Sequence, residues 1–419
     1  MVVNKVGRRS RFNRTPTADI GRAKRQVAVA PKVALWPRVL EEPQWADSGL
    51  AALGTARRIA DLQANRAKVP DWQITQRKIK YRRLGRMFEV KGFDPHNDYV
   101  MIKVERAVDG DNIRARRCFV CGDQPTTGVG EHVFPKWLQT RFGLFDERLT
   151  LINGTFIPYR SLTVPCCAEC NTGFLSRIET EVQEIVERGS VETSADRLSV
   201  ARWMAKILVG ILVKETALLL DRKDPTLGNI VTADFISELV HCQLLLQSAR
   251  KPARFGALHG TFPFTLYWYR IDGLENGFDL STDIVGQSIA MRVGKLGLAF
   301  VNDGGLQMIH GEKGPYGLEG VTVLPHQFGE LAARVHTKAS LRDATHFYLN
   351  SETPTHLTIE QQDVRPFTST TLAGGEMQVF QPWDSWKFSV RAAQVTRLEE
   401  SVFMDTITGR EMTTLTNLL

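Results

Sequence analysis

Five of the six cysteines fall within one 53-residue window, and this clustering limits the fold more than any other feature of the 419-residue chain. Cys118 and Cys121 form one Cys-x-x-Cys pair, Cys167 and Cys170 form a second, and 45 residues separate the pairs. Each pair predicts a tight turn that presents two thiolates, and four sulfurs close a tetrahedral structural zinc site. Cys166 offers an alternative spacing with Cys170, although two intervening residues suit such a turn better than three.

The segments between and after these pairs predict short, regular elements. Pro135 begins a short helix that is expected to reach Phe142. An Asn-Gly pair at 153–154 lies between two apolar runs, which is the strongest short hairpin signal. A further helix is expected from Cys170 through residue 186, because its apolar residues share one face, and Gly189 marks its end.

The motif Glu131-His132-Val133-Phe134-Pro135 stands between the two cysteine pairs, and Asn171 directly follows the second. The order Cys-x-x-Cys, Glu-His-Val-x-Pro, Cys-x-x-Cys-Asn resembles the zinc-knuckle branch of the HNH endonucleases. The resemblance covers about 60 of the 419 residues. It implies a zinc-stabilised ββα-metal module nested in a treble clef, and the zinc would hold the strand near Glu131 against the helix that follows Asn171.

Phosphodiester cleavage needs a base that activates water and a cation that stabilises the charge developing on the phosphate. The resemblance implies that His132 is this base and that Glu131 and Asn171 bind the catalytic metal. Their oxygen donors favour Mg²⁺ or Mn²⁺, so that zinc would be structural and the harder ion catalytic. Three nearby cations are candidates for contacts with flanking phosphates, with a solvated surface position as the equal alternative for each: Lys136, Arg141 and Arg177.

The sequence departs from the HNH pattern at the middle asparagine, which is expected about five residues before the second cysteine pair. Residues 159–165 read Tyr-Arg-Ser-Leu-Thr-Val-Pro and contain no asparagine. Ser161 or Thr163 is the expected substitute for the hydrogen bond that braces the active-site loop. The base and the metal ligands are unaffected by this change.

Positive charge is concentrated ahead of the cysteines. Residues 1–117 hold 26 Lys and Arg against 12 Asp and Glu, whereas the other 302 residues hold 27 against 34. Such a basic segment beside a nuclease motif favours contacts with the phosphates of DNA. A solvated basic tail is the alternative for the first 30 residues.

The predicted fold class is α+β, with five parts along the chain. Residues 1–45 are expected to be a basic, flexible arm, 46–115 a small basic α+β lead-in, and 116–190 the HNH module. Residues 191–255 are expected to be a helical segment, and 256–419 a β-rich C-terminal domain that offers a surface for a protein partner or a second copy of the chain. The elements expected outside the module are helices at 47–68, 194–220 and 233–248 and strands at 87–90, 99–104, 264–269, 289–293, 298–301, 320–324 and 346–349.

The sequence shows no signal for a membrane or for export. Its most apolar stretch, residues 207–213, is far shorter than the roughly 20 apolar residues of a spanning helix. The first 30 residues lack the apolar core of a secretory signal, so a cytoplasmic location without a membrane partner is expected.

The function expected from the motif is a DNA endonuclease, in a setting such as restriction or phage defence. Two alternatives stay open: a non-catalytic, zinc-containing nucleic-acid-binding protein and an RNA nuclease. Glu131, His132 and Asn171 discriminate against pure binding, because binding alone requires none of the three.

Overall fold

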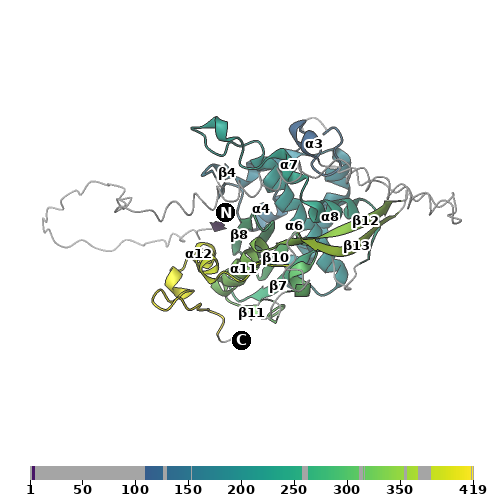
Figure 1. Ribbon diagram of the computed structural model, residues 1–419. Coiled ribbons are helices and arrows are strands. Elements are labelled where there is room, and N and C mark those ends of the chain that lie inside the picture. Colours follow the sequence, from purple (N-terminus) through teal and green to yellow (C-terminus); the bar gives the residue numbers. More distant parts are fainter. Residues whose placement is uncertain are drawn as a thin grey trace, which may run out of the picture. The chain divides into compact units, whose positions relative to one another are not determined.

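The computed structural model describes residues 2–4, 109–125, 130–151, 153–256, 263–310, 315, 317–352, 356–366, 379–416 and 418 (Figure 1). They all lie in the unit formed by Met1–Lys5 and Asp94–Leu419. The arm expected at 1–45, except for residues 2–4, the helix expected at 47–68 and the strands expected at 87–90 and 99–104 lie outside these ranges.

Helices make up much of the described chain before residue 255 and return from residue 306. The α-helices are α3 (Gly110–Arg114), α4 (Lys136–Arg141), α5 (Ser176–Arg188), α6 (Ser194–Glu215), α7 (Ala233–Ile236), α8 (Val240–Arg250), α9 (Leu306–His310), α11 (Pro325–Ser340) and α12 (Ser385–Thr396). Shorter helical turns are η1 (Tyr159–Ser161), η2 (Glu169–Leu175), η3 (Pro225–Leu227) and η4 (Glu400–Val402). Within the described ranges, none of these helices combines the length and the apolar character needed to cross a membrane.

A six-stranded sheet forms the centre of the fold. In spatial order its strands are β1 (Val2–Asn4), β8 (Phe278–Asp283), β9 (Ser288–Val293), β10 (Leu296–Val301), β7 (Thr265–Ile271) and β11 (Thr322–Val323). Neighbouring strands are antiparallel except for β11, which runs parallel to β7. A second sheet has the order β12 (Ala344–Glu352), β13 (Leu357–Pro366) and β6 (Ala253–Gly256).

The central sheet is covered on both faces, which explains its nearly continuous apolar sequence. Met291 of β9 packs in the same cluster as α6, whereas the adjacent Ala290 packs with α11 on the opposite face. Successive side chains of a strand point to opposite faces, so every residue of β9 and β10 is buried. Helix α6, the sheet and α11 therefore form three successive layers (Figure 1).

The two long helices expected before residue 255 are shorter or broken. Helix α6 begins after Thr193, which caps it together with Asp196, but it ends at Glu215 rather than at residue 220. The Asn229 side chain donates a hydrogen bond of 2.6 Å to the carbonyl of Thr216, and residues 218–220 turn back toward Gly228 and Asn229. The expectation of one helix over 233–248 was wrong, since α7 ends at Ile236 and α8 begins at Val240.

The strands expected in the C-terminal part correspond to β7, β9, β10, β11 and β12. Other features of this part went unpredicted: strand β8, in whose sequence Phe-Asp-Leu-Ser-Thr-Asp four of the six residues are polar, strand β13, and helices α9, α11 and α12. Helix α11 has Pro325 in its first turn, a position where proline is well tolerated. The mixed α+β class is thus observed, and helices contribute to the C-terminal part as well as strands.

The cysteine region contains two short antiparallel ribbons and two helices. Strand β2 (Gly130–His132) pairs with β5 (Thr163–Pro165), and β3 (Arg148–Thr150) pairs with β4 (Phe156–Pro158). The second ribbon confirms the hairpin predicted from the Asn-Gly pair, and Gly154 adopts the positive φ of 73° that favours glycine there. Helix α4 confirms the short helix predicted after Pro135.

The predicted helix after the second cysteine pair is present, with an unusual start. It opens with the π-helical turn η2 and continues as α5, which buries Ile178, Val182, Ile185 and Val186 on one face. Gly189 ends it in the left-handed conformation, with φ of 74°. The helical signal in the sequence therefore gave both the buried face and the C-terminus correctly.

The cysteine region shares its core with the sheet. The Phe278 ring of β8 lies 6.4, 6.0 and 6.0 Å from the rings of Phe134, Phe142 and Tyr159. One hydrophobic cluster includes residues from Ile113 through α5 and α6 to Phe300. The boundaries expected at 115/116, 190/191 and 255/256 stay predictions, and the packing shows that these segments share one core.

Candidate metal centre and catalytic site

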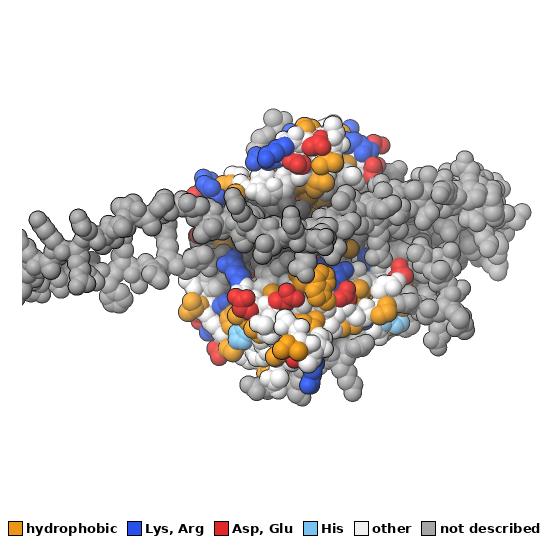
Figure 2. Space-filling view, turned by 60° about the vertical axis from the view of Figure 1, so that its left-hand side comes forward, with side chains coloured by type: hydrophobic (Ala, Val, Ile, Leu, Met, Phe, Trp, Pro, Cys, Tyr) orange, Lys and Arg blue, Asp and Glu red, His pale blue; other side chains and the backbone are white. Residues whose placement is uncertain are grey.

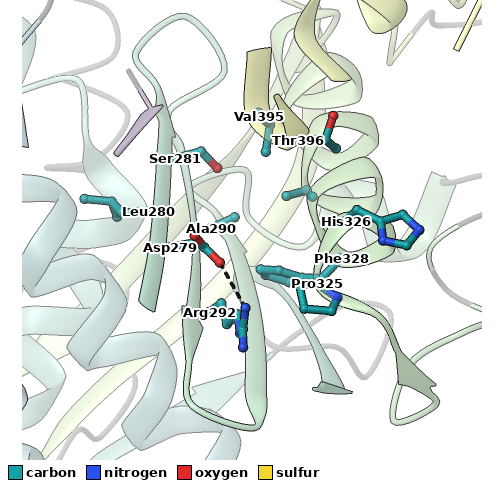
Figure 3. Close-up of a pocket in the computed structure, with 12 residues that line it drawn as sticks. Asp279, Leu280, Ser281, Ala290, Arg292, Pro325, His326, Phe328, Val395 and Thr396 are labelled. Atoms are coloured by element: carbon teal, nitrogen blue, oxygen red, sulfur yellow. Dashed lines mark ion pairs between the residues drawn. The ribbon is translucent and has the colours of Figure 1, made fainter. Parts of the chain in front are cut away.

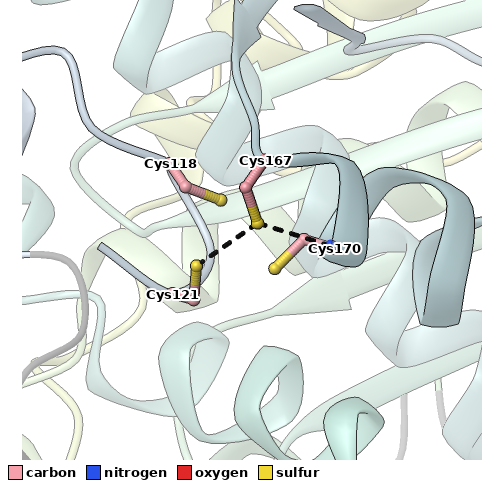
Figure 4. Close-up of side chains that lie close together, drawn as sticks. All are labelled: Cys118, Cys121, Cys167 and Cys170. Atoms are coloured by element: carbon pink, nitrogen blue, oxygen red, sulfur yellow. Dashed lines mark hydrogen bonds between the residues drawn. The ribbon is translucent and has the colours of Figure 1, made fainter. Parts of the chain in front are cut away.

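The four predicted cysteines come together. Cys118 and Cys121 lie on the loop after α3, while Cys167 precedes η2 and Cys170 lies within it; Figure 4 shows their side chains converging. Their Sγ atoms all lie within 4.8 Å of one another, and those of Cys121 and Cys167 are 3.6 Å apart. Bonds of about 2.3 Å to a tetrahedral zinc place sulfurs about 3.8 Å apart. The four thiols therefore have the spacing of a metal site.

The protonation of these thiols also fits a cation site. Hydrogen bonds from Cys166 and Cys170 hold the pKa of Cys118 well below its ordinary value, while the same contact raises the pKa of Cys170. Burial raises the pKa of Cys121 to about 12. Thiols crowded in this way share protons among themselves, and a divalent cation at the centre would take the place of those protons.

Cys166, the alternative ligand, lies beside the group. Its Sγ is 3.9 Å from that of Cys118, and its side chain is fully buried. The group of four that could hold a metal ion contains Cys167 and not Cys166. Among the described residues, this is the only such group of three or more His, Cys, Asp and Glu side chains.

Strand β2 presents Glu131 and His132 on opposite faces of the β2–β5 ribbon, because they are consecutive residues of a strand. Glu131 is 6% exposed and lies on the same side as the buried Val164 of β5, with which it is paired. His132 is only partly buried and lies opposite Thr163. The two predicted catalytic neighbours thus have different surroundings.

Lys206 of α6 forms the centre of the site on the Glu131 side. Its Nζ forms ion pairs with Oε1 of Glu131 and, at 2.6 Å, with Oε1 of Glu179, and donates a hydrogen bond of 2.9 Å to the carbonyl of His132. Three acceptors satisfy the three donors of an ammonium group. Lys206, 1% exposed, therefore connects β2, α5 and α6.

Trp203 and Lys206 are both buried, so this stretch of α6 faces the core, as an apolar stripe at helical spacing predicts. The partnership of Lys206 and Glu179 with the motif was missed. A lysine inside the apolar run Trp-Met-Ala-Lys-Ile-Leu-Val is a usable signal, because a lysine that is fully buried has to be paired.

His132 is in an environment that favours the neutral imidazole. Burial lowers its pKa, and the positive charges of Lys136 and Lys206 lower it further, whereas Glu179 acts in the opposite direction. Burial likewise raises the pKa of Glu179, against the attraction of Lys206. A neutral imidazole is the form that accepts a proton.

Asn171 lies in the π-helical turn, and its backbone N–H donates a hydrogen bond of 3.0 Å to the carbonyl of Cys167. This contact fixes its place beside the cysteines. In the part of the chain that the structure describes, no hydrogen bond joins its side chain to Glu131 or His132. Thr163, expected as a substitute for the missing middle asparagine, lies directly across the ribbon from His132, and Ser161 lies in the turn η1.

The three proposed phosphate contacts have different surroundings. Lys136 is exposed and close enough to His132 to influence its pKa. Arg141 forms an ion pair of 3.6 Å with Glu187, and Arg177 donates a hydrogen bond of 3.2 Å to the carbonyl of Ala249. Lys136 is therefore the candidate with the closest connection to the predicted base.

A cavity of 330 Å³ lies elsewhere, between β8, β9 and the ends of α11 and α12 (Figure 3). Asp279 and Arg292 face each other in it, 3.5 Å apart. The Arg292 guanidinium also donates hydrogen bonds to the carbonyls of Gly294 and Leu274. Because the Arg292 guanidinium already interacts with Asp279, Gly294 and Leu274, it is not available to bind a ligand in this cavity.

Comparison with models of protein families, with characterised proteins and with solved structures gives no match to this chain. The site is therefore interpreted from its own geometry and chemistry.

Proposed function

We propose that the protein is a metal-dependent endonuclease of the HNH kind that hydrolyses phosphodiester bonds in DNA, with a structural zinc at the four cysteines. The observation that carries this proposal is the order of elements around the cysteines. Strand β2 ends at His132 and pairs antiparallel with β5, and β5 is followed by the second cysteine pair and the helix η2–α5. A ββα unit with one cysteine pair ahead of its first strand and the other at the start of its helix is the arrangement expected of a zinc-stabilised ββα-metal module.

In this proposal His132 accepts a proton from the attacking water. Its partly buried position and the neighbouring cations keep the imidazole neutral, and Lys206 holds the backbone of β2 through the His132 carbonyl. Lys136 lies on the side of the predicted base, where it would attract the phosphate. In this proposal the chain itself thus supplies the base, His132, and a nearby positive charge, Lys136, that attracts the phosphate.

The catalytic cation is proposed to be Mg²⁺ or Mn²⁺, with Glu131 and Asn171 as its protein ligands. A carboxylate and an amide oxygen are donors of the right kind for a hard cation, which would stabilise charge on the phosphate. In this structure the Glu131 carboxylate contacts Lys206. Glu179, whose side chain is 21% exposed, contacts the same ammonium and places a second carboxylate in this group.

The contact between Glu131 and Lys206 favours one alternative, a zinc-containing nucleic-acid-binding protein without catalysis. To bind a metal ion, the Glu131 carboxylate would have to give up its contact with the buried ammonium group of Lys206 and replace it with the metal cation. The two functions differ in one measurable respect, because only the nuclease requires His132.

The test uses supercoiled plasmid with the full-length protein in Mg²⁺, in Mn²⁺ and in EDTA. We expect cleavage in the divalent metals, none in EDTA, and a rate loss of about 10²–10⁴-fold for His132→Ala, as is typical when a positioned base is removed. His326→Ala is the matched control, since His326 lies in α11 at the 330 Å³ cavity and outside the proposed catalytic group. Wild-type protein that binds DNA but cleaves in neither metal would establish the binding function instead, and cleavage of RNA alone would establish an RNA nuclease.

A further inference from the structure

A cavity of 850 Å³ lies beside the β2–β5 ribbon. Its walls come from the ribbon itself, from the C-terminal end of α6 and from helices α3 and α7. Its volume falls in the range of roughly 300–1,000 Å³ that is usual for ligand clefts. We call it the ribbon cavity.

The ribbon cavity lies at the end of the ribbon that carries the Gly130–Pro165 pair. Gly130 and residues 163–165 line it, and in the antiparallel register Gly130 pairs with Pro165 and His132 with Thr163. Directly opposed residues of a ribbon point to the same face, with Cβ atoms roughly 4.5–5.5 Å apart. The lining residue Thr163 is therefore the neighbour of the predicted base.

Two cations that line the ribbon cavity have no carboxylate partner. Arg114 forms ion pairs with Asp111 at 2.7 Å and with Asp234 at 3.3 Å, which accounts for the only acidic side chain in the lining. Within the described ranges, no ion pair or side-chain hydrogen bond engages Arg116 or Lys214. On the face drawn in Figure 2, acidic and basic side chains of the described residues are interspersed.

Local structure fixes the positions of these two cations. Exposed Arg116 has a φ of 53° in the left-handed turn that ends α3, where its backbone N–H donates a hydrogen bond to the carbonyl of Ile113 and that of Arg117 donates one to the carbonyl of Asn112. Burial lowers the pKa of half-buried Lys214, and the charge of Arg116 lowers it further. Like charges that line one cavity without a carboxylate partner favour the binding of an anion.

The ligand that fits is a chain of phosphates. Two neighbouring positive charges without a carboxylate attract an anion, and an arginine donates two parallel hydrogen bonds to phosphate oxygens. We propose that the ribbon cavity binds the phosphodiester backbone of the DNA strand that is cleaved, with Arg116 and Lys214 as its phosphate contacts. This inference rests on the proposed function, and it places the path of the strand along the β2–β5 ribbon toward His132.

The test measures binding separately from cleavage. The full-length protein is titrated against a fluorescent DNA duplex in EDTA over a range of salt concentrations, and plasmid cleavage is measured in parallel with Mg²⁺ or Mn²⁺. Arg116→Gln/Lys214→Gln should weaken binding at low salt and reduce the slope of log K against log salt by about 1.8, since each phosphate contact contributes about 0.9. The matched control is Arg254→Gln/Arg410→Gln, which removes two exposed charges away from the cavity and should change the slope by less than half as much.

The binding and cleavage measurements distinguish a failure of the ribbon cavity as a DNA site from a failure of the proposed nuclease function. A double variant that binds with the wild-type slope, or a wild-type protein that does not bind the duplex at low salt, overturns the ribbon cavity as a DNA site, and cleavage by wild type would still support the nuclease. Conversely, loss of the slope in the variant together with no cleavage by wild type in either metal would support the cavity and refute the nuclease. Equal thermal melting of the variants and wild type shows that the comparison is between folded proteins.

Discussion

At the scale of single residues, Lys206 is the group on which the site most depends. It neutralises Glu131 and Glu179 while almost completely buried. Lys206→Met should lower the free energy of unfolding by about 3–5 kcal/mol, because it leaves buried carboxylates without a counter-charge. Urea denaturation would measure this loss.

Two further variants make the Lys206 prediction specific. Lys214→Met changes a lysine two turns later on the same helix, where it is half exposed, and should cost much less stability. Adding Glu131→Gln and Glu179→Gln to Lys206→Met should recover part of the loss, since no charge is then left unpaired. If Lys206→Met and the wild-type protein had the same midpoint of unfolding in urea, the buried ion-pair group would have no role in stability.

Glu215 gives a prediction about pH. Its side chain is 1% exposed, and burial raises its pKa from 4.5 to about 7. The folded state therefore binds this proton more tightly than the unfolded chain, so the stability due to Glu215 is complete below pH 4.5 and is lost as the pH rises toward 7. Glu215→Gln should match wild type at pH 4 and exceed it by up to about 3 kcal/mol at pH 8.

Urea denaturation at several pH values would test the Glu215 prediction. Glu399→Gln, a change at an exposed glutamate, is the control and should leave the pH dependence of stability unaltered. A constant difference between Glu215→Gln and wild type from pH 4 to pH 8 would contradict the assignment.

At the scale of elements, the cysteine turns should depend on their metal. We expect one zinc per chain, and Cys121→Ser should release it and unfold the β2–β5 ribbon and η2, because metal binding and local folding are coupled in small sites. Elemental analysis and hydrogen exchange would measure the two effects. Cys242→Ala is the control, since this cysteine lies in α8 outside the group of four. Reduced wild-type protein without bound zinc would refute the prediction.

The elements that could be predicted from the sequence are those with local signals. Gly154 and Gly189 marked a hairpin and a helix end, and the apolar face of α5 followed from its spacing. Strand β8 was missed because its polar residues have partners on other elements: Ser281 forms a hydrogen bond with the buried His336, and Asp283 forms an ion pair with Arg391. At the break between α7 and α8, the Ser237 hydroxyl donates a hydrogen bond to the carbonyl of Asp234, a local contact that periodicity does not reveal.

At the scale of the whole molecule, the sequence predicted which cysteines meet, but not what surrounds the motif. The spacing of the cysteine pairs is local information, whereas Lys206 lies 74 residues from His132 and reaches it only through the packing of α6. The ribbon cavity likewise combines Arg116 with Lys214, from elements far apart in the chain. Residue types were enough to predict metal ligands and a base, while their partners depend on tertiary packing.

The charge distribution of the whole chain leads to the last prediction. Residues 1–117 carry all of the excess of Lys and Arg over Asp and Glu, and changing charges there tests their role without shortening the chain. Strand β1 pairs with β8, so a deletion from residue 1 would also disturb the sheet. Substituting glutamine for Arg8, Arg9, Arg11 and Arg14 should therefore weaken binding to all DNA sequences alike and reduce its salt dependence, since phosphate contacts carry no base readout.

Titration of two duplexes of unrelated sequence over a range of salt concentrations would measure this effect. Cleavage at saturating protein should persist, because these arginines are not part of the proposed catalytic group. The same number of substitutions on the described surface, at Arg222, Lys223, Arg254 and Arg410, controls for the change in net charge. An unchanged salt slope in the N-terminal variant, together with a reduced slope in Arg116→Gln/Lys214→Gln, would show that the ribbon cavity and not the basic N-terminal segment supplies the phosphate contacts.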